Sequence, residues 1–66
     1  MAKRIDLLVH DEGTIYLLRG VSRRGQRWIE DHISEDHQEW AGAVVVEHRY
    51  IGPIVGGAIG DGLVVR

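Results

Sequence analysis

Short apolar runs alternate with polar breaks in the first third of the chain, in a pattern typical of a β-hairpin. The runs RIDLLVH (4–10) and TIYLLRG (14–20) are separated by a connection that ends in Gly13. Glycine readily takes the positive φ that a short hairpin connection needs. We therefore expect an antiparallel hairpin over 4–10 and 14–20. Neighbouring leucines in each run place apolar groups on both faces, so at least one strand should be covered on its second side.

The next segment, SRRGQRWIEDHIS (22–34), has the periodicity of an amphipathic helix. Ser22 is suited to the N-cap position. The residues that recur on one helical face are Gly25, Trp28, Ile29, His32 and Ile33. We expect this stripe to lie on the sheet, with Gly25 allowing a close approach and Trp28 supplying most of the buried area.

The second half predicts a strand, a helix and a final strand. WAGAVVVEHRY (40–50) reads as a strand whose valine run indicates burial on both faces. Gly52 is the expected cap of the second helix, Pro53 its first residue and Gly62 its C-terminal stop. LVVR (63–66) is the expected last strand. From residue 40 onward the order is therefore strand, helix, strand.

Taken together, the elements predict one α+β domain over residues 1–66. The expected order is ββαβαβ, with a four-stranded mixed sheet in one layer and two helices on one face in the other. The last strand–helix–strand unit should be a right-handed parallel crossover.

Length and composition limit how such a domain is stabilised. A chain of 66 residues buries only about 60% of the surface that its unfolded form exposes. It has no cysteine, so disulfides and thiolate metal sites are excluded. Tight packing or self-association must take their place. The absence of cysteine also fits the reducing cytoplasm of a bacterial host.

We expect no targeting or membrane segment. The apolar stretch that follows the basic start is broken by Asp6 and ends at His10. The longest uncharged run, Tyr50 to Gly60, is far shorter than the roughly 20 residues needed to cross a bilayer.

The charges are distributed unevenly, which bears on partners more than on the fold. Basic residues dominate as far as Trp28. They are Lys3, Arg4, Arg19, Arg23, Arg24 and Arg27, against Asp6, Asp11 and Glu12. Residues 30–39 carry only acidic charges, at Glu30, Asp31, Glu35, Asp36 and Glu39. Arginines at the start of the expected helix and carboxylates at its end oppose the helix dipole, at about 0.3–1 kcal/mol for each charge. Something other than helix stability therefore favours this arrangement.

Two binding hypotheses follow from this distribution. The acidic segment, with Trp40 as an apolar anchor beside it, could bind a protein by imitating nucleic-acid phosphates. Alternatively, Arg23, Arg24 and Arg27, together with Arg49, could bind nucleic acid directly. The net charge of −2 favours the acidic surface and a protein partner.

The glycine-rich stretch IGPIVGGAIGDGL (51–63) predicts close packing rather than phosphate binding. Gly52 and Gly57 have the spacing of a phosphate-binding loop, but the lysine and hydroxyl residue that should follow are replaced by Ala58 and Ile59. A dinucleotide loop is equally disfavoured, because the last glycines lead into a strand. Gly52, Gly56 and Gly60 would instead form a bare side of the helix, packed on the sheet and the neighbouring helix. The alternative is that this side meets a second copy in a homodimer.

Candidate catalytic residues are few, and we expect no enzyme, cofactor or metal site. Ser22 is better explained as a cap, and Ser34 lies in a polar helix end. The only lysine, Lys3, is terminal. His32 and His37 are five residues apart, so they would leave a helix on different sides, which disfavours zinc.

The EHRY motif is the one exception. Glu47, His48, Arg49 and Tyr50 are the residue types that small ribonuclease toxins use. On a strand, however, they would alternate between two faces, with Glu47 beside Arg49.

The sequence also resembles a group of small proteins carried by bacteriophages, plasmids and integrated elements. The resemblance rests on Ile15 to Arg19, Trp28, VVVEHRY (44–50) and Asp61-Gly62-Leu63. It brings no activity to carry over. It implies a mobile-element origin, in which small acidic proteins without cysteine often inhibit host defence, as anti-CRISPR proteins do. The leading hypothesis is a non-catalytic inhibitor of a bacterial defence or nucleic-acid-handling protein.

Overall fold

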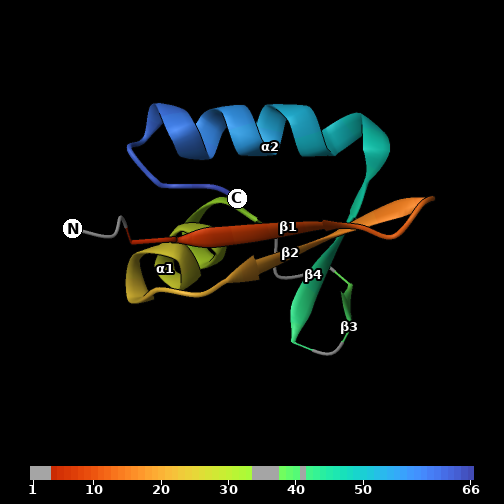
Figure 1. Cartoon of the computed structure of the whole chain (residues 1–66), viewed down its shortest axis with the longest axis horizontal. Helices are drawn as coiled ribbons and strands as arrows, with labels where there is room; N and C mark the ends of the chain where they lie inside the picture. Colours follow the sequence, from red (N-terminus) through yellow and green to blue (C-terminus); the bar gives the residue numbers. More distant parts are fainter. Residues whose placement is uncertain (1–3, 34–37, 41) are drawn as a thin grey trace.

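The fold is a four-stranded sheet with two helices (Figure 1). The computed structural model describes residues 4–33, 38–40 and 42–66. The elements are β1 (Leu7–Asp11), β2 (Ile15–Gly20), α1 (Arg23–His32), β3 (Glu39–Trp40), β4 (Ala43–Glu47) and α2 (His48–Gly60). The strand order is β1-β2-β4-β3, and all neighbours are antiparallel. The expected α+β class is confirmed.

The N-terminal hairpin and the first helix form as the sequence predicts. β1 pairs with β2, and Gly13 in the turn has a φ of 96°. The Gly13 amide donates to Asp11 Oδ1 over 2.7 Å. Ser22 is the N-cap of α1, and its hydroxyl accepts from the Gly25 amide at 3.0 Å. Local sequence signals of turn and cap therefore decide this half of the fold.

The second half differs in detail from the prediction. The strand expected over 40–50 is a hairpin of β3 and β4 that ends at Glu47. α2 then begins at His48, so Pro53 lies inside the helix and is not its first residue. The end of α2 is as predicted, because Gly62 has a φ of 89° just after it. Neither helix in the described ranges has the length and apolar character to cross a bilayer.

The last residues return to β1 instead of forming a full strand. Leu7 and Val65 make a single parallel bridge. The Asp6 amide donates to the Val64 carbonyl at 2.9 Å, and the Val9 amide donates to the Arg66 carbonyl at 2.8 Å. This segment runs parallel to β4, as a crossover requires, but β1 and β2 lie between the two. The expected mixed character of the sheet is thus limited to one bridge.

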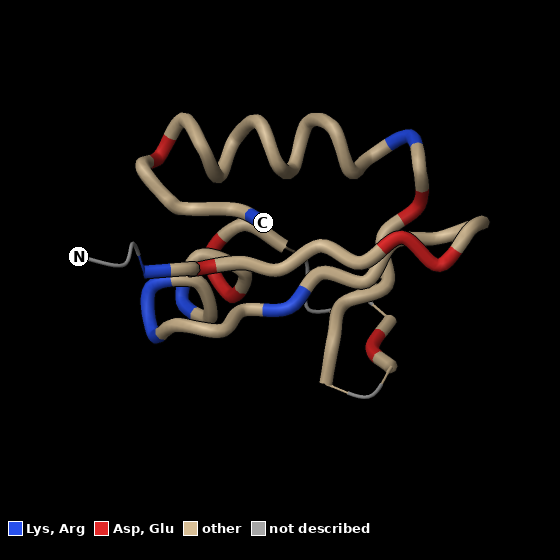
Figure 2. Tube along the Cα trace, viewed as in Figure 1, with Lys and Arg blue, Asp and Glu red and all other residues tan. Residues whose placement is uncertain are grey.

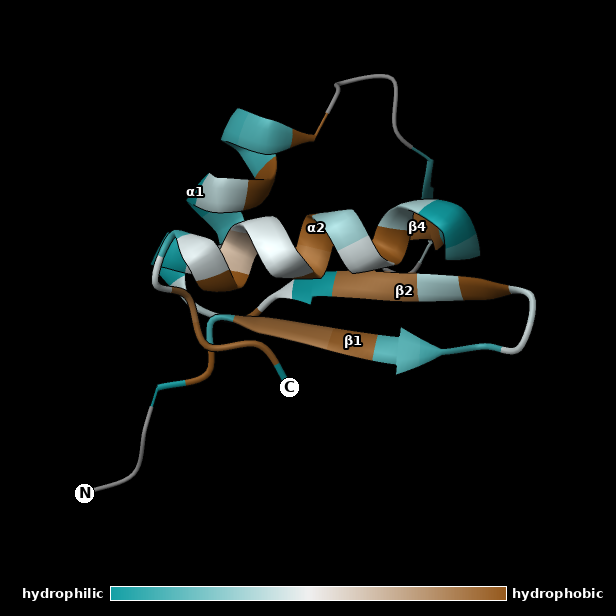
Figure 3. Cartoon of the chain, turned by 90° about the horizontal axis from the view of Figure 1, so that it is seen from above, coloured by the Kyte–Doolittle hydropathy of each residue, from teal (hydrophilic) through white to brown (hydrophobic). Residues whose placement is uncertain are grey.

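The pairing register separates the sheet into two faces. On one face, Leu7, Leu18, Val44 and Val46 are buried with residues of both helices, among them Trp28 and Ala58. The expectation that the helices share a face is therefore supported by one common core. In Figure 3, α2 lies in front of the strands and α1 lies beside it. Residues of the opposite face, such as Leu8, Leu17 and Val45, have no helix in this core cluster against them.

The glycines of α2 do not pack as the sequence analysis expected. A Cβ added at Gly52, Gly56 or Gly60 would meet nothing within 4 Å. The packing side of α2 is formed instead by Ile51, Ile54 and Ala58, which recur at helical spacing. The prediction that the bare side presses on the sheet and on α1 is therefore wrong, and this side is open.

Candidate functional site

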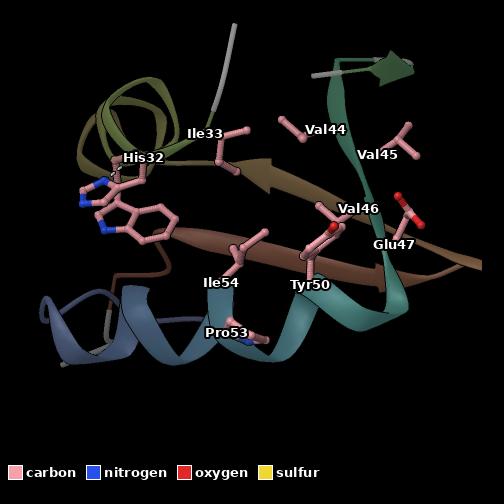
Figure 4. Close-up of a pocket in the computed structure, with 10 residues that line it drawn as sticks. His32, Ile33, Val44, Val45, Val46, Glu47, Tyr50, Pro53 and Ile54 are labelled. Atoms are coloured by element: carbon pink, nitrogen blue, oxygen red, sulfur yellow. Dashed lines mark hydrogen bonds between the residues drawn. The ribbon is translucent and has the colours of Figure 1, made fainter. Parts of the chain in front are cut away.

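An apolar pocket of about 500 Å³ lies between α2, β4 and the end of α1, and we call it the α2 pocket (Figure 4). It is lined by Trp28, His32, Ile33, Val44, Val45, Val46, Glu47, Tyr50, Pro53 and Ile54. It exists because α2 begins directly after β4 and turns away from its direction (Figure 4), leaving a gap over the valines. Its size lies in the range of ligand and side-chain pockets, about 300–1,000 Å³.

One end of the α2 pocket is held in place by an aromatic and hydrogen-bonded cluster. The rings of Trp28 and His32 are stacked with centroids 4.4 Å apart. His32 Nδ1 donates to the Trp28 carbonyl at 2.9 Å. Trp28 Nε1 donates to Asp61 Oδ2 at 2.8 Å, and His32 Nε2 lies 3.5 Å from the same oxygen. These contacts tie the end of α1 to the end of α2, so this wall of the pocket is rigid.

The other end carries the polar groups of the pocket. Glu47 Oε2 lies 3.6 Å from Arg49 Nε, and the Arg49 guanidinium carbon lies 4.8 Å from the centre of the Tyr50 ring. Tyr50 is 49% exposed. The pocket therefore combines an apolar floor with one carboxylate and one phenol near the solvent, a composition that suits an apolar group with a polar or basic neighbour.

The described carboxylates of the acidic segment lie near the α2 pocket in the sequence but do not line it. Ile33, the C-cap of α1, is a lining residue, and Glu39 pairs with the lining residue Val44 in the β3–β4 register. Glu30 and Asp31 are exposed on α1, and Asp31 Oδ2 lies 3.7 Å from Arg27 Nε. Glu35 and Asp36 lie outside the described residues. Glu39 therefore lies on β3 beside Val44, a lining residue of the pocket, whereas Glu30 and Asp31 lie on the exposed surface of α1.

Trp40 does not share this side of the sheet. It pairs with Ala43, so its side chain belongs to the face opposite the helices, where it is 61% exposed. The predicted contact set of acidic residues plus Trp40 therefore divides over two faces.

The basic residues form a second candidate site. Arg4, Arg23, Arg24 and Arg27 line one hollow of about 560 Å³, together with Asp31 and Asp61. Figure 2 shows basic positions gathered at the start of the described chain and at the start of α1, and further basic positions in β2, at the start of α2 and at the C-terminus. The helix arginines are therefore joined by Arg4, which sequence reasoning did not include, whereas Arg49 lies apart with Glu47.

A buried carboxylate, Asp6, organises the chain next to this hollow. It is 2% exposed. Its Oδ1 accepts from the Ser22 hydroxyl at 2.6 Å and its Oδ2 accepts from the Val64 amide at 2.9 Å. The pKa of Asp6 is held below its usual value, chiefly by the hydrogen bond from Ser22 and then by that from Val64. The charges of Arg24 and Arg4 act in the same direction, whereas burial opposes the shift. The role of Asp6 is structural, because both oxygens are occupied by the chain itself.

The EHRY residues do not converge. Glu47 ends β4, whereas the other three residues begin α2. His48 Nε2 donates to the Gly13 carbonyl at 2.8 Å, and its ring lies 4.7 Å from that of Tyr16. The pair of Glu47 and Arg49 that sequence analysis expected is present. This geometry does not support proton transfer by the four groups at one bond.

Within ranges 4–33, 38–40 and 42–66, no cluster of three or more His, Asp or Glu side chains could hold a metal ion. His37 lies outside these ranges, so the pair of His32 and His37 is not described. No family model, curated protein or solved structure matches the chain. The geometry alone therefore carries the functional argument.

Proposed function

We propose that this chain is a small non-catalytic binding protein of mobile-element type, which captures and inhibits a bacterial defence or nucleic-acid-handling protein. The observation that carries the proposal is the α2 pocket, an apolar cavity of about 500 Å³ next to the acidic segment. In this mode of binding, the partner seats an apolar side chain in the pocket and presents basic groups to the carboxylates around it. Anti-CRISPR proteins are the inhibitor class that this proposal fits.

The apolar part of the contact follows from the lining. Val44, Val46 and Ile54 form the floor, and the stacked rings of Trp28 and His32 form a wall that does not need to rearrange. Preformed pockets of this kind are where the binding energy of protein interfaces concentrates. A partner side chain that enters the pocket gains about 25 cal/mol for each Å² of apolar surface removed from water.

The polar part sets the class of partner. Glu47 lines the pocket, with Arg49 Nε 3.6 Å from its Oε2, and Glu39 pairs with Val44, another lining residue. Glu35 and Asp36 belong to the same acidic segment in the sequence. Clustered carboxylates raise the association rate of a basic surface and disfavour acidic ones. Proteins that handle nucleic acid present such basic surfaces.

Quantitative affinity capture from the lysate of the native host tests the proposal. Tagged wild type should enrich one protein, and Tyr50→Arg should lower its recovery at least tenfold by blocking the pocket mouth. Ile59→Arg is the matched control, because Ile59 is on the same helix, is 58% exposed and does not line the pocket. Charge reversal of Glu35 and Asp36 should lower recovery as well. Equal recovery with Tyr50→Arg and Ile59→Arg would contradict the proposal.

The basic hollow supports a second candidate function, direct binding of nucleic acid. Four arginines face two carboxylates there. Substituting glutamine at Arg23, Arg24 and Arg27 together should abolish binding of a labelled duplex or RNA, and the loss should be greatest at low salt. Arg49→Gln should leave binding unchanged, because Arg49 lies at the other end of the molecule.

A further inference from the structure

The sheet face opposite the helices is apolar and bears a large exposed side chain. Its members, from the pairing register, are Leu8, His10, Ile15, Leu17, Arg19, Trp40, Ala43 and Val45. Trp40 is 61% exposed and Leu8 is 39% exposed. Two hollows beside Trp40, of about 460 and 360 Å³, are both lined by Leu17 and Glu12, and the larger one also reaches Arg19. We call this surface the open face.

Charges on the open face are segregated along the strand direction. At one end, Arg19 lies between Leu8 and Ala43, with Trp40 next in the row. At the other end, Ile15 pairs with Glu47, and the Glu12 amide donates to the Ile15 carbonyl at 2.9 Å. One end therefore carries Arg19, and the other carries Glu12 and Glu47. Each of these carboxylates also has a partner in its own chain, because His10 Nε2 lies 2.7 Å from Glu12 Oε2 and Arg49 Nε lies 3.6 Å from Glu47 Oε2. Arg19 makes no ion pair with any residue in the described part of the chain.

We propose that the open face is covered by a second copy of this chain in a twofold dimer. The twofold axis lies midway between the two sheets, parallel to them and perpendicular to their strands. This operation places the basic end of each copy on the acidic end of the other. Arg19 then meets Glu12 and Glu47 of the other copy in both directions, as an isologous interface requires. Rotation about an axis along the strands would instead bring the two Arg19 side chains together.

The same operation accounts for Trp40. It carries each Trp40 from the basic end of β3 over the hollow lined by Glu12, Ile15, Leu17, Gln38 and Val45 of the other copy. The two sheets would pack face to face about 10 Å apart. The exposed tryptophan of the edge strand then becomes an apolar anchor of the interface, a role for which tryptophan is well suited. Self-association also supplies the burial that a 66-residue domain without cysteine lacks.

This dimer does not depend on the inhibitor function. The α2 pocket and the open face meet at Val45 and Glu47, but Tyr50 belongs to α2, so Tyr50→Arg should reduce partner capture and leave the mass in solution unchanged. Failure of one proposal is therefore distinguishable from failure of the other.

Sedimentation velocity across a concentration series tests the dimer. Wild type should reach twice the monomer mass as the concentration rises, and Arg19→Glu should weaken the association at least tenfold. Adding Glu12→Arg to Arg19→Glu should restore it, because the charges are exchanged between the ends. Arg23→Glu, a reversal away from the open face, is the matched control. Trp40→Ser should give a monomer whose circular dichroism matches that of wild type.

Several results would overturn this arrangement. The dimer is ruled out if the wild type stays monomeric at every concentration. The open face is ruled out as the interface if neither Arg19→Glu nor Trp40→Ser weakens the dimer. A dimer that survives these changes but is broken by Gly56→Glu would place the contact on the bare side of α2 instead.

Discussion

Gly25 in the first turn of α1 lies directly against the backbone carbonyl of Asp6, with no room for a Cβ between them. Two further contacts join the same segments, because the Val21 amide donates to the Asp6 carbonyl at 2.9 Å and the Ser22 hydroxyl donates to the Asp6 carboxylate. The start of α1 is thus docked on the segment that leads into β1. This contact sets the distance between the helix layer and the sheet.

The first prediction concerns this contact. Gly25→Ala should lower the free energy of unfolding by about 1–3 kcal/mol, toward the upper end because the obstructing atoms are backbone. Urea denaturation followed by circular dichroism measures the change. A loss of less than a few tenths of a kcal/mol would show that α1 can move away from Asp6 at no cost.

On the open side of α2, in contrast to Gly25, a glycine can be replaced by alanine without a clash. Gly56→Ala should raise the free energy of unfolding by about 0.5–1 kcal/mol, because alanine loses less backbone entropy in a helix than glycine. An added Cβ meets nothing within 4 Å there. The same urea titration applies, and Gly60→Ala should act in the same direction, because an added Cβ meets nothing within 4 Å there either. Destabilisation by either change would mean that the bare side of α2 is covered.

Asp6 should make stability depend on pH in the acid range. Its pKa is lower in the folded chain than in the unfolded chain, chiefly through the Ser22 hydrogen bond. Its contribution is therefore fully present above the unfolded-state pKa, about 3.9, and is lost as the pH falls through the folded-state pKa. Urea midpoints measured from neutral to acid pH should show wild type above Asp6→Asn at neutral pH, with the difference shrinking in acid. Parallel curves would refute this linkage.

The bond from Trp28 Nε1 to Asp61 should couple the two helices. Trp28→Phe keeps the aromatic packing largely in place but removes the donor, and Asp61→Ala removes the acceptor. A double-mutant cycle on the free energy of unfolding should give a coupling of about 1 kcal/mol. The coupling should be absent when Asp61→Ala is replaced by Asp31→Ala, since Asp31 pairs with Arg27 and not with Trp28.

Elements determined by neighbouring residues were predictable from the sequence. The hairpin, the Ser22 cap and the stripe of Gly25, Trp28 and Ile29 depend on residues a few positions apart. Their periodicities and turn chemistry are visible in a single sequence.

The start of α2 was not predictable in the same way. Three residues, His48, Arg49 and Tyr50, follow a valine run and have no strong preference against strand, so the sequence favours Pro53 as the first helical position. In the structure the helix begins five residues earlier. The two-residue strand β3 is too short to show any period. Both features depend on contacts made across the sheet.

The packing side of α2 could have been read from the sequence. Ile51, Ile54 and Ala58 repeat at helical spacing, and that signal is stronger than the spacing of the glycines. The role of Asp6 could not have been predicted from the sequence, because its partner Val64 is 58 residues away along the chain. The split of the acidic segment from Trp40 likewise needs the β3–β4 register.

The return of the last residues to β1 has a consequence for how this molecule meets others. Val64, Val65 and Arg66 occupy the outer backbone groups of β1, and the opposite margin of the sheet is the very short β3. Among the described residues, neither margin offers a long row of unpaired backbone amides and carbonyls. Such a row would allow a strand of another chain to pair with the sheet. Partners of this protein must therefore bind to its side chains and not to a free strand edge. Its binding specificity can then be changed by single substitutions.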